Sequence, residues 1–157
     1  MLLQPLRWLV WLAGRLLMSL RYWVTVRGTE EVFRKPGPYL VLPNHPGFSD
    51  PANVLARLWN VFRFSPVANE ANFQNVVLGP FAWLLRTIPV PDMEKASAEA
   101  HQRASAAAAE VVKALKNGTN VVVWPAGRLC RDGRERLGGT RAVSDILAAY
   151  PQTTVVL

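Results

Sequence analysis

The sequence predicts one α/β domain, in which helices flank a mixed, partly parallel sheet, preceded by an amphipathic helix. Apolar, β-branched runs alternate with helix-forming segments along most of the chain, an order that favours parallel strand pairing. Half of the 157 residues are hydrophobic, enough for one sizeable core but not comfortably for two. The first 23 residues are rich in leucine and tryptophan but carry interspersed arginines. We therefore expect a helix over residues 1–23 and a domain over residues 24–157.

The amino-terminal segment has the composition of a signal peptide, a membrane-spanning helix or a helix on a surface. No small-residue cleavage site follows it, which disfavours a signal peptide. Arg7 and Arg15 interrupt the apolar run. Each costs ~2.5–3.5 kcal/mol at mid-bilayer against ~0.3–0.6 kcal/mol gained per leucine, so spanning is not favoured either.

A helix in the membrane interface fits this segment better. On a helical wheel, its polar positions share an arc of roughly 160° opposite most leucines. These positions are Gln4, Arg7, Gly14, Arg15, Ser19 and Arg21. The pattern predicts aromatic rings at headgroup level and arginines turned toward anionic lipid. The alternative is a leucine-rich helix packed on the domain's own core.

The rest of the chain alternates between strand-like and helix-like segments. Apolar or β-branched runs predict strands at residues 22–28, 38–45, 61–70, 87–92, 119–127 and 153–157. Helical patterns predict helices at residues 50–60, 78–86, 93–118 and 139–150. In the first helix, Asp50 is expected at the N-cap and Pro51 at the first helical position. Because the chain stops within the last strand, we expect it to be a fragment.

The chain is strongly basic, with a formal net charge of +7 and a pI near 10.3. This charge predicts an anionic partner: nucleic acid, a phospholipid surface, a phosphorylated small molecule or an acidic carrier protein. The arginines are spread over the first helix and one loop rather than along a nucleic-acid recognition element, so we expect no nucleic-acid partner. The single cysteine, Cys130, excludes an internal disulfide framework and fits a reducing compartment, the cytoplasm or its membrane face.

The stretch "YLVLPNHPGFSDPANVL" places His45 at the end of an apolar strand, five residues before Asp50. A histidine held by a carboxylate can take a proton from a hydroxyl, because the carboxylate fixes the tautomer and stabilises the imidazolium. Asp50 could instead serve only as a helix cap. The other histidine, His101, fits a solvated helix face, and Cys130 has no partner histidine nearby.

A second stretch, "VVVWPAGRLCRDGRERLGG", runs from a strand into a basic loop. Gly127 lets the backbone approach a ligand, and guanidinium groups match phosphate oxygens. The arginines of the loop are Arg128, Arg131, Arg134 and Arg136. The loop therefore predicts a phosphate-bearing substrate. The alternative is a solvated basic loop, partly neutralised by Asp132 and Glu135.

Together, these stretches resemble the glycerophosphate and lysophospholipid acyltransferases. "NHPGFSD" is similar to the Asn-His-x-x-x-x-Asp block of that family, and "WPAGRLCRDG" resembles its Phe-Pro-Glu-Gly-Thr-Arg block. Between them, "GPFAWLLRTIPVPD" occupies the place of the second block, where Gly79 and Arg86 match. The arginine is out of register there, and Asp92 or its neighbours stand at the usual position. The resemblance covers the chain from about Val24 onward.

The resemblance implies a glycerol-3-phosphate acyltransferase-like fold and an O-acyltransferase. The enzyme would transfer a fatty acyl group from acyl-CoA or acyl carrier protein to the hydroxyl of a lysophospholipid or glycerol phosphate. No further cofactor and no metal is implied, and the chain would lie at the cytoplasmic face of a membrane as a peripheral or monotopic protein. His45 would be the general base and Asp50 its orienting partner. The implied substrate-binding residues are Asn44, Gly47, Gly127, Arg128, Arg131 and Arg86.

The sequence departs from the family pattern in two ways. Ala126 stands where the family has glutamate, which removes a carboxylate expected to organise an arginine or the acceptor. A fourth, proline-containing block that follows in family members is missing, so we expect a carboxyl-terminally incomplete domain. These departures keep open a second interpretation, a catalytically impaired acyltransferase-like protein that binds lipid.

Overall fold

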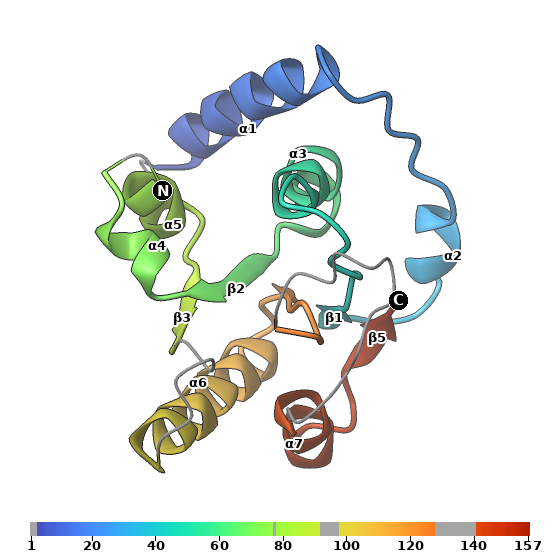
Figure 1. The fold of residues 1–157 in the computed structure, drawn as a ribbon. Coiled ribbons are helices and arrows are strands. Elements are labelled where there is room, and N and C mark those ends of the chain that lie inside the picture. The colour runs from blue at the N-terminus through green and yellow to red at the C-terminus, as the bar shows by residue number, and fades with distance from the viewer. Residues whose placement is uncertain (1–2, 77, 92–97, 128–140) are drawn as a thin grey trace.

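The computed structural model arranges the chain around a five-stranded sheet in the order β3-β2-β4-β1-β5 (Figure 1). It describes residues 3–76, 78–91, 98–127 and 141–157. The strands are β1 Tyr39–Val41, β2 Ser65–Asn69, β3 Ile88–Val90, β4 Val121–Val122 and β5 Thr154–Val156. Every pair of these strands is parallel. The α/β prediction is confirmed, and pairing within the described sheet is wholly parallel rather than mixed.

Helices cover both faces of the sheet. They are α1 Gln4–Ser19, α2 Thr29–Val32, α3 Asp50–Phe62, α4 Ala71–Gln74, α5 Leu78–Leu84, α6 Ala98–Lys116 and α7 Ala142–Ala149. Figure 1 shows α3 on one face, with α1 lying outside it, and α6 and α7 on the other face. This arrangement is expected because parallel strands need crossover connections, which bury both faces of the sheet.

The core has two halves because successive residues of a strand point to opposite faces. Leu40 of β1 belongs to the half beneath α6 and α7, whereas its neighbours Tyr39 and Val41 face α3. The half beneath α6 and α7 contains Leu40, Leu42, Val111, Leu115, Val121, Val123 and Ile146. The half beneath α3 contains Tyr39, Val41, Trp59, Phe62, Phe64 and Val122. The central strands β1 and β4 are therefore rigidly held on both sides.

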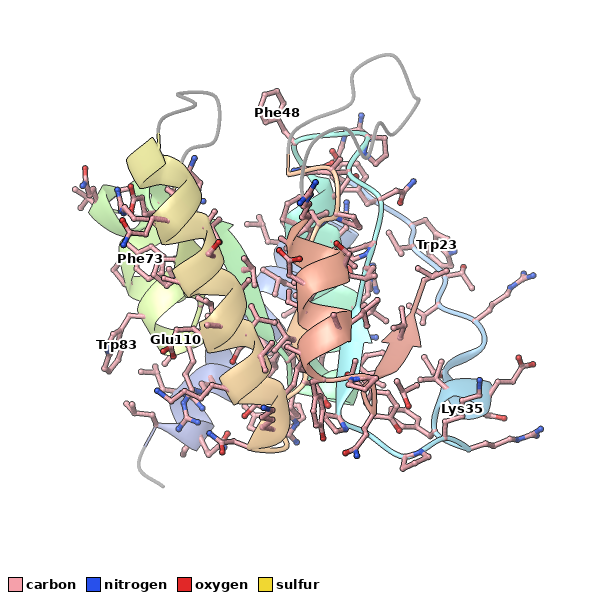
Figure 2. The ribbon with its side chains drawn as sticks, turned by 90° about the horizontal axis from the view of Figure 1, so that it is seen from below. Trp23, Lys35, Phe48, Phe73, Trp83 and Glu110 are labelled. Atoms are coloured by element: carbon pink, nitrogen blue, oxygen red, sulfur yellow. The ribbon has the colours of Figure 1, made fainter. Side chains whose placement is uncertain are left out.

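The register places the ends of β1 and β4 side by side. Val41 lies opposite Val122, and the amide of Val123 donates to the carbonyl of Val41 over 2.9 Å, so the pairing continues past the end of β4. Figure 2 shows the two edges of the sheet: Phe48, which follows β1, lies at one, and Lys35, which precedes β1, lies at the other. We refer to them as the carboxyl edge and the amino edge.

Helix α1 turns its leucines outward and its tryptophans inward. The indole of Trp11 donates to the carbonyl of Ala56 in α3 over 3.0 Å, and the Trp8 ring lies 6.1 Å from that of Trp59. Leu9 and Leu16, in contrast, are 64% and 61% exposed. The alternative interpretation expected the leucines of this segment to pack on the domain's own core. In the structure, the leucine face is exposed instead. Among the described helices, none combines the length and apolar character needed to cross a bilayer.

Residues 22–28 do not form the strand that their β-branched composition predicts. They connect α1 to α2 along the outside of the molecule (Figure 1) and adopt no regular structure. Trp23 is 98% exposed within this segment. A β-branched run becomes a strand only where a neighbouring strand can pair with it, and here β5, not this segment, pairs with β1.

Candidate active site

His45 lies at the carboxyl edge, in the loop that leaves the central strand β1. The pairing of this strand with β5 ends where the amide of Leu42 donates to the carbonyl of Val156 over 2.8 Å. Residues 43–46 then have no regular structure, and α3 begins at Asp50. The His45 side chain is 17% exposed, so it is largely enclosed yet reachable. This position at the end of a parallel strand is where α/β proteins commonly bind ligands.

Asp50 faces the histidine, as the sequence predicts. Its Oδ2 lies 3.5 Å from His45 Nδ1, within range of an ion pair once the imidazole is protonated. The pair is looser than a hydrogen bond, and Nδ1 is buried without a hydrogen-bond partner in the described part of the chain. A carboxylate on the Nδ1 side favours the tautomer in which Nε2 is free to accept a proton.

The local fold fixes the Asp50 carboxylate from the loop side. Its Oδ2 accepts a hydrogen bond from the backbone amide of Gly47, within the turn that leads into α3. The predicted N-cap role is wrong, because Ser49 is the cap position and Asp50 is already the first helical residue. Its side chain reaches back to the loop and toward His45 instead of capping the helix. Capping therefore does not explain this aspartate.

Trp124, two residues after the end of β4, is the neighbour of His45 that the sequence did not predict. The two ring centroids lie 5.9 Å apart at a tilt of 48°. The indole nitrogen is buried and has no hydrogen-bond acceptor in the described ranges. An unused buried donor beside a candidate base is available to a ligand. Its signal in the sequence was the aromatic residue that closes "VVVW", directly before the turn.

The turn after Trp124 brings the "WPAG" stretch to the same edge. The amide of Gly127 donates to the carbonyl of Trp124 over 3.0 Å, and Gly127 has a φ of +62°, which residues with a Cβ rarely adopt. Ala126 is only 5% exposed. At the position where the resemblance places a glutamate, this chain thus has a small, buried side chain.

The remaining predicted residues have different placements. Asn44 is exposed in the same loop as His45. The arginines at 128 and 131, together with Cys130, Asp132, Glu135 and Asp92, lie outside the described residues, as does the side chain of His101. Among the side chains that the structure describes, no three potential metal ligands cluster together.

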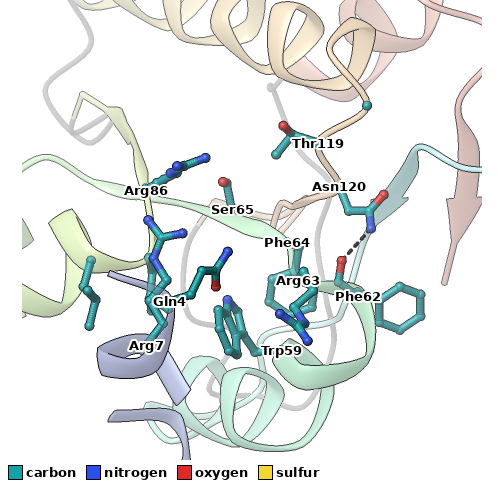
Figure 3. Close-up of a pocket in the computed structure, with 13 residues that line it drawn as sticks. Gln4, Arg7, Trp59, Phe62, Arg63, Phe64, Ser65, Arg86, Thr119 and Asn120 are labelled. Carbon is teal, nitrogen blue, oxygen red and sulfur yellow. Dashed lines mark hydrogen bonds between the residues drawn. The ribbon is translucent and has the colours of Figure 1, made fainter. Parts of the chain in front are cut away.

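Arg86 does not accompany His45. It directly precedes β3, at the amino edge, whereas His45 follows β1, at the carboxyl edge. Its neighbours include Arg7 and Arg63, which line a common pocket with it (Figure 3). In a parallel sheet these two edges are separated by the strands themselves, and the five residues of β2 span about 16 Å at ~3.3 Å per residue.

The carboxyl edge therefore combines an enclosed histidine, a carboxylate facing it and a glycine turn, an arrangement suited to general base catalysis. The sequence model of the family described as "Acyltransferase" matches residues 23–156. The chain therefore belongs to the acyltransferase family, as its motifs predicted, and acyl transfer is the chemistry of that family. Comparison with curated proteins and with solved structures gives no significant match.

Proposed function

We propose that this chain transfers a fatty acyl group from acyl-CoA or acyl carrier protein to the hydroxyl of a lysophospholipid or glycerol phosphate. The observation that carries the proposal is the 3.5 Å approach of Asp50 Oδ2 to His45 Nδ1 at the edge where the Trp124–Gly127 turn also lies. A base of this kind contributes ~10²–10⁴ in rate. Membership of the acyltransferase family supports the reaction class.

In the proposed reaction, His45 acts as a general base and no acyl-enzyme forms. Nε2 accepts the proton of the acceptor hydroxyl while the hydroxyl oxygen bonds to the thioester carbonyl carbon. The carbon–sulfur bond then breaks, and the thiolate takes the proton from the imidazolium to leave as a thiol. Asp50 holds the ring and stabilises its charged form. The indole of Trp124, close to His45, is an unused donor among the described residues and would serve an oxygen of either substrate.

The phosphate of the acceptor is proposed to bind beside this base. Gly127 exposes its backbone at the turn, and Arg128 and Arg131 follow it in the sequence. Guanidinium groups bind phosphate oxygens in pairs, which fixes orientation as well as charge. Asn44 and Gly47 would shape the loop that carries His45, Gly47 through its bond to Asp50.

The leucine face of α1 is proposed to rest on a membrane. Leu9, Leu16 and Leu17 are each more than 60% exposed, although the opposite side of the helix packs on α3. An amphipathic helix with this polarity buries its apolar side in the headgroup region, where burial of a leucine side chain contributes ~1.5–3 kcal/mol. The cytoplasmic face is the proposed location, since acyl-CoA and acyl carrier protein are donors from that compartment.

A catalytically impaired lipid-binding protein is the second candidate, because Ala126 offers no carboxylate at the carboxyl edge. An arginine that loses its acidic partner can lose its orientation toward the acceptor. On this account, the chain would bind lysophospholipid beside His45 without turnover.

Thiol release from a long-chain acyl-CoA, with lysophosphatidate as acceptor, tests the proposal. Wild type is compared with His45→Ala and with the matched control His101→Ala, which removes the other histidine of the chain. Release that requires acceptor and His45, but not His101, supports an ester-forming acyltransferase. Equal release by wild type and His45→Ala contradicts it. Saturable lysophosphatidate binding without release favours the second candidate.

A further inference from the structure

A pocket at the amino edge carries three arginines that the proposed reaction does not use. It has a volume of about 250 Å³ and forms where α1, the end of α3, the start of β2, the end of α5 and the residues before β4 meet. Arg7 comes from α1, Arg63 follows α3, and Arg86 follows α5 (Figure 3). Gln4 and Thr119 add neutral polar groups to its lining.

No carboxylate among the described residues compensates the positive charge of this pocket. None of the three guanidiniums forms an ion pair with a carboxylate of the described chain. The Nε of Arg7 is buried and has no hydrogen-bond partner there. Burial lowers the pKa of Arg7 from its usual range, and the charge of Arg86 lowers it further. Arginine nevertheless remains charged at neutral pH, so like charges face a shared space that an anion would neutralise.

The backbone holds two of these arginines in an unfavourable conformation. Arg63 has a φ of +53° and Arg86 a φ of +55°, and no other residue with a Cβ in the described ranges has a positive φ. Left-handed conformations are disfavoured for such residues, and their clustering is typical of functional sites. Glycine or asparagine would suit both positions better as helix ends. Arginine occupies both positions, and both arginines line the same pocket.

Aromatic contacts position the side chain of Arg63 without neutralising its charge. The guanidinium of Arg63 stacks over Trp8, with 4.5 Å from Cζ to the ring centroid, and lies 5.8 Å from Trp59. Trp59 itself is buried in the core under α3. Asn120 also lines the pocket. Its side chain accepts a hydrogen bond from the amide of Tyr39 and donates one to the carbonyl of Phe62, so it holds the pocket wall in place.

From these observations we infer that the amino-edge pocket binds a phosphate group, through Arg7, Arg63 and Arg86. The site goes beyond the proposed acyl transfer and lies at the opposite edge of the sheet from His45. Three arginine side chains supply paired donors suited to phosphate oxygens. A phospholipid headgroup is one source of the group, since Arg7 belongs to the helix whose leucine face is exposed, and a free phosphate is the other.

The inference is tested with Arg7→Gln/Arg86→Gln and with two comparison variants. Arg34→Gln removes an exposed arginine elsewhere, and Arg128→Gln/Arg131→Gln removes the arginines predicted for the other edge. Inorganic phosphate is titrated calorimetrically at constant ionic strength. In parallel, binding is measured to phosphatidylcholine vesicles with and without phosphatidate.

Loss of at least tenfold in affinity for inorganic phosphate, in the Arg7/Arg86 variant alone, identifies a free-phosphate site. If this variant loses phosphatidate-dependent vesicle binding but does not differ from wild type in the titration with inorganic phosphate, the site binds a lipid headgroup. Equal behaviour of this variant and Arg34→Gln in both assays overturns the inference, as does loss confined to Arg128→Gln/Arg131→Gln. Arg86→Lys retains the charge and is expected to keep most of the affinity, which separates charge from folding defects.

Discussion

The two edges of this sheet are built from the same parallel strands but differ in their charge arrangement. At the carboxyl edge, His45 faces Asp50, so a developing positive charge meets a carboxylate. At the amino edge, Arg7 and Arg86 face each other without a described carboxylate between them. In the proposed functions, the first edge moves a proton and the second holds an anion. The basic residues of one chain would then serve two purposes, according to whether they lie before or after a strand.

Removal of the base gives the largest expected effect. His45→Ala should lower acyl transfer by ~10²–10⁴, because it removes the acceptor of the hydroxyl proton. Phosphate binding at the amino edge should stay unchanged, since the variant touches only the carboxyl edge. Steady-state thiol release and phosphate titration on one preparation measure both. A joint loss would mean that the edges are not independent.

Membrane binding should depend on the leucine face of α1. Leu9→Gln/Leu16→Gln is expected to weaken vesicle binding by roughly a hundredfold or more, at ~1.5–3 kcal/mol per leucine. Both side chains are exposed, so the melting temperature should hardly change. Vesicle co-sedimentation is the measurement, with Leu157→Gln, a change at another exposed leucine, as control. Unaltered binding would show that α1 does not dock on lipid.

Loss of the orienting carboxylate should cost less than loss of the base. Asp50→Asn retains an oxygen for the amide of Gly47 but removes the charge facing His45. We expect kcat to fall roughly tenfold to a hundredfold, a part of the ~10²–10⁴ that general base catalysis supplies. A kcat equal to that of wild type would leave Asp50 with a purely structural role.

Substitutions at the amino edge should lower phosphate affinity and leave acyl transfer nearly unchanged. Arg7→Gln/Arg86→Gln is expected to lose at least about tenfold in phosphate affinity, a typical effect of removing charge-assisted hydrogen bonds. Its kcat, measured at saturating acceptor, should remain within about twofold of wild type if the edges act separately. A fall in kcat to the level of Asp50→Asn would instead show that Arg86 contributes to acyl transfer, and would contradict the separation of the two edges.

The smallest expected effect is on stability. Arg86→Gln should raise the melting temperature by about 2 °C in phosphate-free buffer, because it removes a like charge beside Arg7. Added phosphate should stabilise wild type more than the variant, which retains Arg7 and Arg63. Differential scanning calorimetry measures both, with Arg34→Gln as control. A lower melting temperature for Arg86→Gln without phosphate would show that its charge is already compensated.

The fold and the proximity of His45 to Asp50 were predictable because they follow from order along the chain. Alternating strands and helices predicted parallel pairing, and parallel pairing brings the ends of β1 and β4, with His45 and Trp124, to one edge. Asp50 was expected near the histidine because only a short turn separates them. Its expected capping role failed because that turn draws the carboxylate back to Gly47.

The orientation of α1, the conformation of residues 22–28 and the position of Arg86 depend on tertiary packing and could not be predicted from sequence order. The helical wheel of α1 separated polar from apolar positions, but only the structure shows that Trp8 and Trp11 face α3 while the leucines face outward. Residues 22–28 had strand composition but no strand to pair with. Arg86 was grouped with the catalytic blocks by sequence order. One signal could have separated it: it precedes its strand, whereas His45 follows one.

The most direct test of this account measures acyl transfer and phosphate binding on the same three preparations: wild type, His45→Ala and Arg7→Gln/Arg86→Gln. The account predicts a double dissociation. His45→Ala loses thiol release and keeps phosphate affinity, whereas the arginine variant keeps thiol release at saturating acceptor and loses phosphate affinity. If both variants lose both properties, or if His45→Ala releases thiol as fast as wild type, the division of function between the two edges is contradicted.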